Sequence, residues 1–127
     1  MQWEVRPGHT YPALHIALEP GEEVVAEPGA FLLMRGPLEI KTSSLGIGKG
    51  ILRSLFGAES FFLNSYRATG QGELWLAPPA PGDIYYLPLG GNGYFVQDTA
   101  YLAHHGDVEV GVGWRGFKGL LNEGELV

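Results

Sequence analysis

The sequence AFLLMRGPLEI at residues 30–40 recurs in outline as AYLAHHGDVEV at residues 100–110, which lie 70 positions later. The glycine-rich stretch GIGKG at residues 46–50 then matches GVGWRG at residues 111–116. Leu55 and Glu59 match Leu121 and Glu125, at a spacing of 66 positions. Similarity that extends over a whole unit indicates internal duplication. The sequence therefore predicts a single β domain over residues 1–127, made of one unit at about 14–83 and a partial second unit at about 84–127.

Short apolar or alternating runs between glycines and prolines indicate strands throughout the chain. They lie at residues 2–6, 14–18, 24–26, 31–34, 38–42, 60–63, 73–76, 84–89, 94–96, 100–103 and 108–110. The continuous run 31–34 predicts a buried strand, and the runs at 60–63 and 73–76 predict a hairpin around the turn 69–72. This pattern predicts an all-β fold, either a barrel-like antiparallel sandwich or a closed barrel.

The segment 46–57 departs from this pattern. Ile51, Leu52, Leu55 and Phe56 recur at helical spacing between Gly50 and Gly57, which predicts one short helix near residues 50–57. We interpret this stripe and its copy at Trp114 and Phe117 as a candidate interaction surface. Three interpretations remain open: a helix that caps one end of the barrel, a contact with a partner or another subunit, and contact with a membrane interface through the apolar and basic side chains.

The composition restricts the classes of partner. The chain has 8 Lys and Arg residues against 14 Asp and Glu residues, with a net charge of −6, so nucleic acid is not expected as a partner. It has no cysteine, which excludes disulfides, thiolate metal sites and a cysteine nucleophile. No apolar run approaches the roughly 18 residues that span a bilayer. The first residues, MQWEVR, do not resemble a signal peptide, so we expect a cytoplasmic protein.

No motif predicts catalysis, a metal or a cofactor. His104 and His105 are adjacent, and adjacent strand residues point to opposite faces, so the two rings are poorly placed to share one ion. The run GVGWRG at 111–116 matches a dinucleotide-binding motif in letters only, because that motif needs a βαβ unit. None of the serines lies in a G-x-S-x-G elbow. We therefore expect no catalytic residues, no metal site and no cofactor.

An ordered set of short motifs resembles a known family. The set is GILRSL at 50–55, ESFF at 59–62, GELWLAP at 72–78, PGDI at 81–84, YLA at 101–103 and GFKGL at 116–120. It is similar to the mitochondrial-biogenesis AIM-type family, a domain of unknown function with prokaryotic relatives. Ala58 departs from the pattern, since the family usually has a second glycine there.

The resemblance implies a double-stranded β-helix or barrel-like fold similar to that of the tryptophan RNA-binding attenuation protein. It also implies internal duplication and a homo-oligomer, with a trimer-type assembly favoured. It does not imply RNA binding, because the attenuation protein uses basic residues on its ring edge and this chain has few basic residues.

These observations predict a non-enzymatic, self-associating β-domain that acts as a scaffold or binding module. One alternative is a small-molecule-binding or enzymatic β-barrel with its site in the barrel mouth. A second alternative is a peripheral membrane-associated protein. We also expect the last residues, Glu123 to Val127, to complete a sheet in this chain or in a neighbour, because a free strand edge invites pairing.

Overall fold

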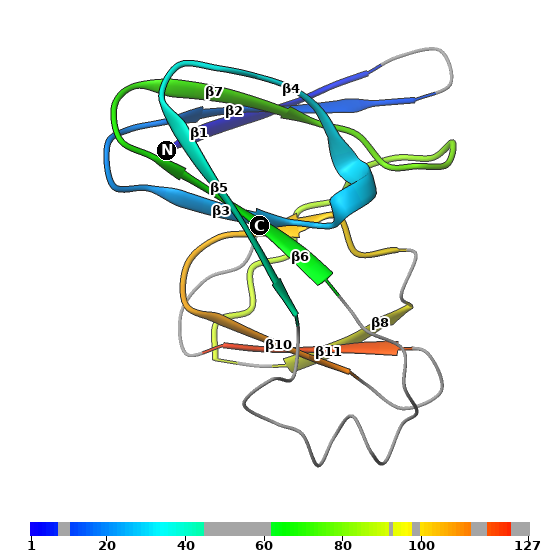
Figure 1. The fold of residues 1–127 in the computed structure, drawn as a ribbon. Coiled ribbons are helices and arrows are strands. Elements are labelled where there is room, and N and C mark those ends of the chain that lie inside the picture. The colour runs from blue at the N-terminus through cyan, green and yellow to red at the C-terminus, as the bar shows by residue number, and fades with distance from the viewer. Residues whose placement is uncertain (8–10, 45–61, 92, 98–99, 113–116, 123–127) are drawn as a thin grey trace.

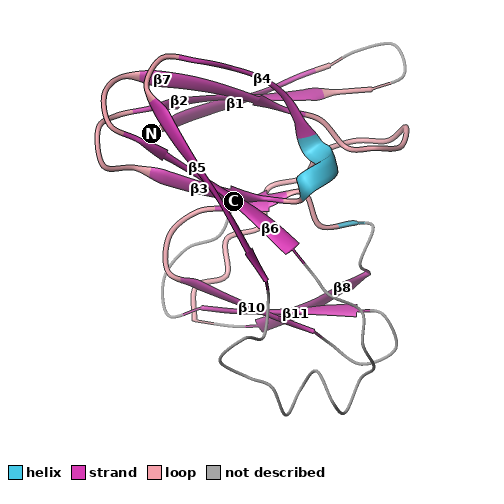
Figure 2. Cartoon of the chain, in the orientation of Figure 1, coloured by secondary structure: helices cyan, strands magenta, loops and turns pink. Residues whose placement is uncertain are grey.

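The computed structural model describes residues 1–7, 11–44, 62–91, 93–97, 100–112 and 117–122. In these ranges the chain is built of antiparallel strands, with the short 3₁₀ turn η1 (Pro28–Ala30) between two of them (Figure 2). The prediction of an all-β fold is confirmed. The predicted helix near residues 50–57 and the predicted last strand at 123–127 lie outside the described residues.

The strands form three sheets, which we name A, B and C (Figure 1). Sheet A has the order β1 (Gln2–Arg6), β2 (Ala13–Leu18), β7 (Gly72–Leu76) and β4 (Phe31–Arg35). Sheet B has the order β5 (Leu38–Ser44), β6 (Phe62–Ala68), β3 (Glu23–Ala26) and β9 (Ala103–His104). Sheet C has the order β10 (Val108–Val112), β11 (Phe117–Asn122) and β8 (Gly93–Gln97).

Sheet B lies between the other two sheets, so β3 and β6 contribute side chains to two cores (Figure 1). Val24 and Tyr66 pack with Leu14, Ile16 and the other inward-facing residues of sheet A. Leu63 points to the opposite face, because strand side chains alternate. There Leu63 packs with Leu89 and Tyr101, while Val96, Val108 and Val110 of sheet C lie against this second core.

Sheets B and C share one arrangement of paired residues. In both, a central strand pairs with an earlier strand on each side, and β8 and β10 follow β3 and β5 by 70 positions. The central partners are Tyr66 with Val24 and Ile40 in sheet B, and Leu120 with Tyr94 and Val110 in sheet C. This matched register favours the duplication that the sequence predicts.

The register also changes one part of the predicted alignment. Leu120 has in sheet C the paired position that Tyr66 has in sheet B, so β11 follows β6 by 54 positions. The sequence alignment of Leu55 with Leu121 used a spacing of 66 positions in this region. Leu121 therefore matches Arg67, not Leu55. The expected copy of the amphipathic helix at 117–121 is instead strand β11, because this segment forms ladders with both β8 and β10.

Four glycines turn the backbone at the positions that the repeat marks. Gly21 and Gly91 have φ of 88° and 87°, and Gly36 and Gly106 have φ of 91° and 85°. Positive φ is costly for residues with a Cβ atom, which explains why glycine recurs at both pairs of positions.

Two strand predictions need correction. The run 31–34 does form a strand, β4, but all five of its residues are exposed because β4 lies at the edge of sheet A. The predicted hairpin of the runs 60–63 and 73–76 does not form in the described residues, since β6 pairs within sheet B and β7 pairs within sheet A. The turn 69–72 therefore carries the chain from one sheet to the other.

A third prediction also fails, because residues 84–89 form no strand. By the spacing of 70 positions, residues 84–88 match β2, which is paired on one side by β1 and on the other by β7. In the described part of the chain, the second unit has no equivalent of either partner strand. The segment therefore has the residues of a strand but pairs with none of the described strands. The predicted strand 100–103 is reduced to the two residues of β9.

Gly36 lies between β4 and β5, where the chain passes from sheet A to sheet B. The segment 69–71, which passes from sheet B back to sheet A, lies beside it, and there the Thr69 amide donates to the Pro37 carbonyl oxygen at 3.0 Å. A Cβ atom on Gly36 would lie 2.5 Å from the Gln71 carbonyl oxygen, whereas one on Gly21 would have no atom within 4 Å. Both glycines have nearly the same φ, so they separate steric contact from backbone strain.

We predict that Gly36→Ala lowers the free energy of unfolding by about 3 kcal/mol, since the new methyl group adds a clash with fixed backbone to the cost of positive φ. Gly21→Ala is the matched control and should lose only about 1 kcal/mol, the cost of positive φ alone. Urea denaturation followed by circular dichroism measures both values. Equal losses in the two variants would contradict the prediction, because they would show that the backbone at Gln71 moves away from the new methyl group at little energetic cost.

Candidate functional site

An apolar cavity of about 380 Å³ lies beside sheet A. Trp3 and Val5 of β1 and Leu14 of β2 form one wall, and they lie on the face of sheet A that also forms the core. The opposite wall is the connection between β7 and β8. The remaining lining residues are 78–87, Val96 and 100–103.

The connection has a composition that keeps it out of a sheet. Pro78, Pro79, Pro81 and Pro88 each lack an N–H group, so the segment cannot form a continuous ladder. It places aromatic side chains at the cavity instead. The Tyr86 ring lies 4.9 Å from the Trp3 ring, centroid to centroid, and the Tyr85 side chain is 80% exposed. The wall is thus stiff in its backbone and lined with aromatic rings.

Among the described residues that line this cavity, Asp83 is the one with an ionisable acidic or basic side chain other than tyrosine. The other polar side-chain groups of the lining are the hydroxyls of Tyr85, Tyr86 and Tyr101 and the indole N–H of Trp3. A mostly apolar cavity with a few polar groups is typical of a small-molecule site.

A buried polar pair lies near the second core. The hydroxyl of Tyr101 is 2.6 Å from Nδ1 of His104 and 3.3 Å from the carbonyl oxygen of Val25. Burial lowers the pKa of His104 to about 4, with a further contribution from His105, and burial also raises the pKa of Tyr101. Both groups are therefore neutral near pH 7, which suits a structural hydrogen bond better than proton transfer.

The two adjacent histidines have different surroundings. His104 is buried against the core, and His105 follows it on a strand end where the next side chain points away. Within the described ranges, no group of three or more His, Asp or Glu side chains is arranged to hold a metal ion.

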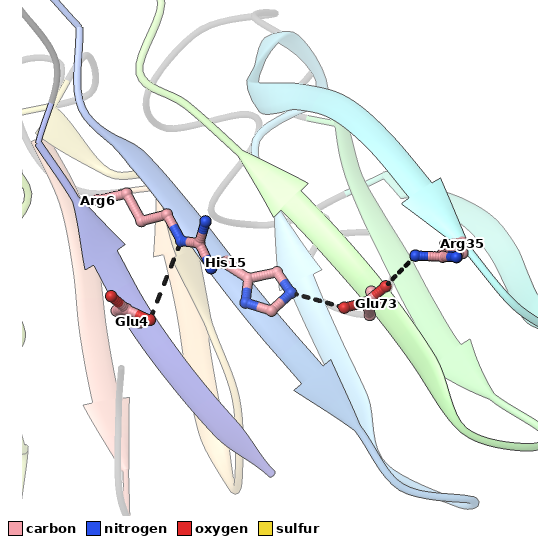
Figure 3. A network of polar contacts seen from close by, with 5 residues as sticks. All are labelled: Glu4, Arg6, His15, Arg35 and Glu73. Atoms are coloured by element: carbon pink, nitrogen blue, oxygen red, sulfur yellow. Dashed lines mark hydrogen bonds and ion pairs between the residues drawn. The ribbon is translucent and has the colours of Figure 1, made fainter.

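A row of polar contacts crosses the outer face of sheet A (Figure 3). His15 Nε2 lies 3.1 Å from Glu73 Oε1, and Arg35 lies 3.6 Å from the other oxygen of the same carboxylate. The His15 ring lies 4.3 Å from the Trp75 ring, and the Arg6 guanidinium lies over that ring at 4.8 Å. These residues line an open strand surface rather than the cavity, so we assign them to stabilising cross-strand pairs.

Another surface of the fold, at the edge strand β4, is apolar. All four residues from Phe31 to Met34 are exposed by 40–50% at the free edge of sheet A. Ile40 of β5 and Phe62 of β6 are 47% and 49% exposed. We call these six residues the β4 edge patch. The Phe31 ring stacks on the Tyr66 ring at 6.0 Å, so the patch continues into the core between sheets A and B.

The structure does not describe most of the predicted interaction surface. Ile51, Leu52, Leu55, Phe56 and Trp114 lie outside the described residues. Phe117 begins β11, which places it in sheet C.

The sequence analysis predicted neither the cavity beside sheet A nor the β4 edge patch. The run 31–34 was a visible signal for the β4 edge patch, but a continuous apolar run does not distinguish a buried strand from an exposed edge strand.

The family follows from comparison with known proteins. A sequence model of the family described as "Mitochondrial biogenesis AIM24" matches residues 3–127. The chain belongs to this family. The resemblance seen in the short motifs is thereby confirmed.

Two streptococcal relatives extend the family assignment. An uncharacterised protein of Streptococcus pyogenes serotype M6 is 31% identical over 116 residues, which cover 86% of this chain and 47% of that protein. The crystal structure of a Streptococcus pyogenes protein matches with a TM-score of 0.76 at 26% identity, over 98% of this chain and 62% of that one. The chain therefore spans about half the length of the curated relative. Among the described residues of this family member, no helix is long and apolar enough to cross a membrane.

We predict that the buried histidine makes this family member sensitive to mild acid. The pKa of His104 is about 4 in the fold and 6.5 ordinarily, so the unfolded chain binds the proton more readily. The contribution of neutral His104 to the free energy of unfolding is fully present above pH 6.5. It is lost as the pH falls toward 4, by a total of about 3 kcal/mol. Glu22, whose pKa is lowered by the Met1 ammonium group and by the Glu19 amide, contributes in a separate window below 4.5.

Chemical denaturation between pH 7.5 and 4.5 measures this dependence, and the comparison is with His104→Gln. The variant should be less stable at pH 7.5 but should lose less stability than the wild type on acidification. Parallel pH profiles for the two proteins would contradict the assignment of His104 as a buried neutral group.

Proposed function

We propose that this chain is a self-associating, non-enzymatic β-domain that acts as a scaffold or binding module. The observation that carries the proposal is the β4 edge patch, six exposed apolar side chains on β4, β5 and β6. Extensive exposed apolar surface is characteristic of protein interfaces.

The two edges of sheet A differ in a way that supports this proposal. β1 carries Glu4 and Arg6 on its outer face, and charged side chains are a common protection of an edge strand. Residues 31–34 of β4 carry no charge, and the first charge on the strand is Arg35 at its end. An unprotected edge is a good site for pairing with another chain.

The occupant that we propose is a second copy of this chain. β4 and β5 follow one another across Gly36 and Pro37, and among the described strands each is the last of its sheet, β4 in sheet A and β5 in sheet B. Contact of β4 in one copy with β5 in the next uses two different surfaces, and such contacts form a ring when the rotation between copies closes. A trimer, which the family resemblance favours, is one such ring.

Separate observations support the remaining parts of the proposal. The buried, neutral pair of Tyr101 and His104 favours a structural role over catalysis. The matched registers of sheets B and C favour a duplicated, double-stranded β-helix architecture. A cytoplasmic location agrees with the absence of cysteine. The apolar cavity favours a second candidate function, the binding of a small molecule.

Multi-angle light scattering tests the self-association directly. We expect the wild-type chain to have a mass near three times its 13.8 kDa. The double variant Leu32→Glu and Leu33→Glu should be a monomer, because it places two charges in the proposed interface. Tyr94→Glu is the control, since Tyr94 is similarly exposed but lies in sheet C. A monomeric wild type at high concentration, or an oligomeric double variant, would overturn the proposal.

A further inference from the structure

We propose that the cavity beside β1 binds a small organic cation that has an apolar or aromatic body. The inference goes beyond self-association, since the cavity shares no lining residue with the β4 edge patch. Three features of the cavity carry it: its size and apolar walls, the carboxylate of Asp83, and its aromatic rings.

The size and walls select a small, largely apolar ligand. A volume of about 380 Å³ lies at the lower end of the range for small-molecule sites, roughly 300–1,000 Å³. Val5, Leu14, Ile84 and Leu102 supply aliphatic surface, and the prolines of the connection supply a wall with little conformational freedom. A wall that is already ordered loses little entropy when a ligand binds.

The charge of the lining selects a cation. Asp83 is exposed, and no ion pair joins it to another side chain in the described part of the chain. None of the described residues that line the cavity is a lysine, an arginine or a histidine. An anionic ligand, such as a fatty acid, would place its carboxylate beside Asp83 with no basic group to offset the repulsion. A protonated amine would find a carboxylate partner there.

The aromatic rings strengthen the preference for a cation. Trp3 and Tyr86 pack together at 4.9 Å with their planes tilted by 42°, and Tyr85 stands beside them with most of its surface exposed. Tryptophan and tyrosine faces attract organic cations, and groups of such rings recognise substituted ammonium ions. The exposed ring of Tyr85 is free in space to cover part of a bound ligand.

Isothermal titration calorimetry with three probes of one shape tests the proposal. Phenethylammonium carries the cation, 2-phenylethanol is its neutral analogue and phenylacetate is its anionic analogue. We expect phenethylammonium to bind roughly tenfold more tightly than 2-phenylethanol, and phenylacetate to bind most weakly. Asp83→Asn should remove most of the preference for the cation. Asp107→Asn is the matched control, because it makes the same substitution at an exposed residue outside the cavity.

A second variant guards against a fold defect in the first. Tyr86→Leu should weaken binding of the cation while it preserves binding of the neutral probe, because the leucine keeps apolar contact without a ring. Equal affinity for the cation and the neutral probe in the wild type would overturn the proposal and indicate a site for apolar groups, such as a peptide side chain. Failure of phenethylammonium to bind up to roughly 10 mM would overturn it as well.

Discussion

The rest of the structure depends on the burial of both faces of sheet B. Val24 and Tyr66 point toward sheet A, while Val25 and Leu63 point toward sheet C. Because side chains alternate along a strand, a slip of one residue in β3 or β6 would exchange the two cores. Tyr66 is large and fully buried, so it could not be accommodated on the face that Leu63 occupies without displacing the second core. This double constraint sets the register of sheet B and positions the two flanking sheets.

The two surfaces that we connect with function lie at apolar, strand-like segments. Residues 84–88 align with β2 at the spacing of 70 positions, but they form no strand, and their tyrosines line the cavity. Among the described strands, β4 is the last of sheet A, and its apolar side chains are exposed. The chain spans about half the length of its curated relative, so the family contains proteins with more chain around this unit.

Much of the fold could be predicted from periodicity and glycine. Alternation in residues 14–18 and 38–42 located β2 and β5, and the glycines at 36 and 106 marked real turns. The partner of each strand could not be predicted, because pairing depends on distant residues rather than on local pattern. For that reason the supposed hairpin at 60–76 is two strands of different sheets, and the run 31–34 is exposed rather than buried. The cavity likewise depends on a contact between β1 and a connection more than 75 positions away.

The central claim is that a second copy of the chain covers the β4 edge. Hydrogen–deuterium exchange of the β4 amides, measured by mass spectrometry over a range of protein concentrations, tests this claim most directly. The account predicts that protection of residues 31–35 rises with concentration, whereas protection of β1, the charged edge of the same sheet, stays constant. Exchange in β4 that is independent of concentration and as fast as in β1 would contradict the account.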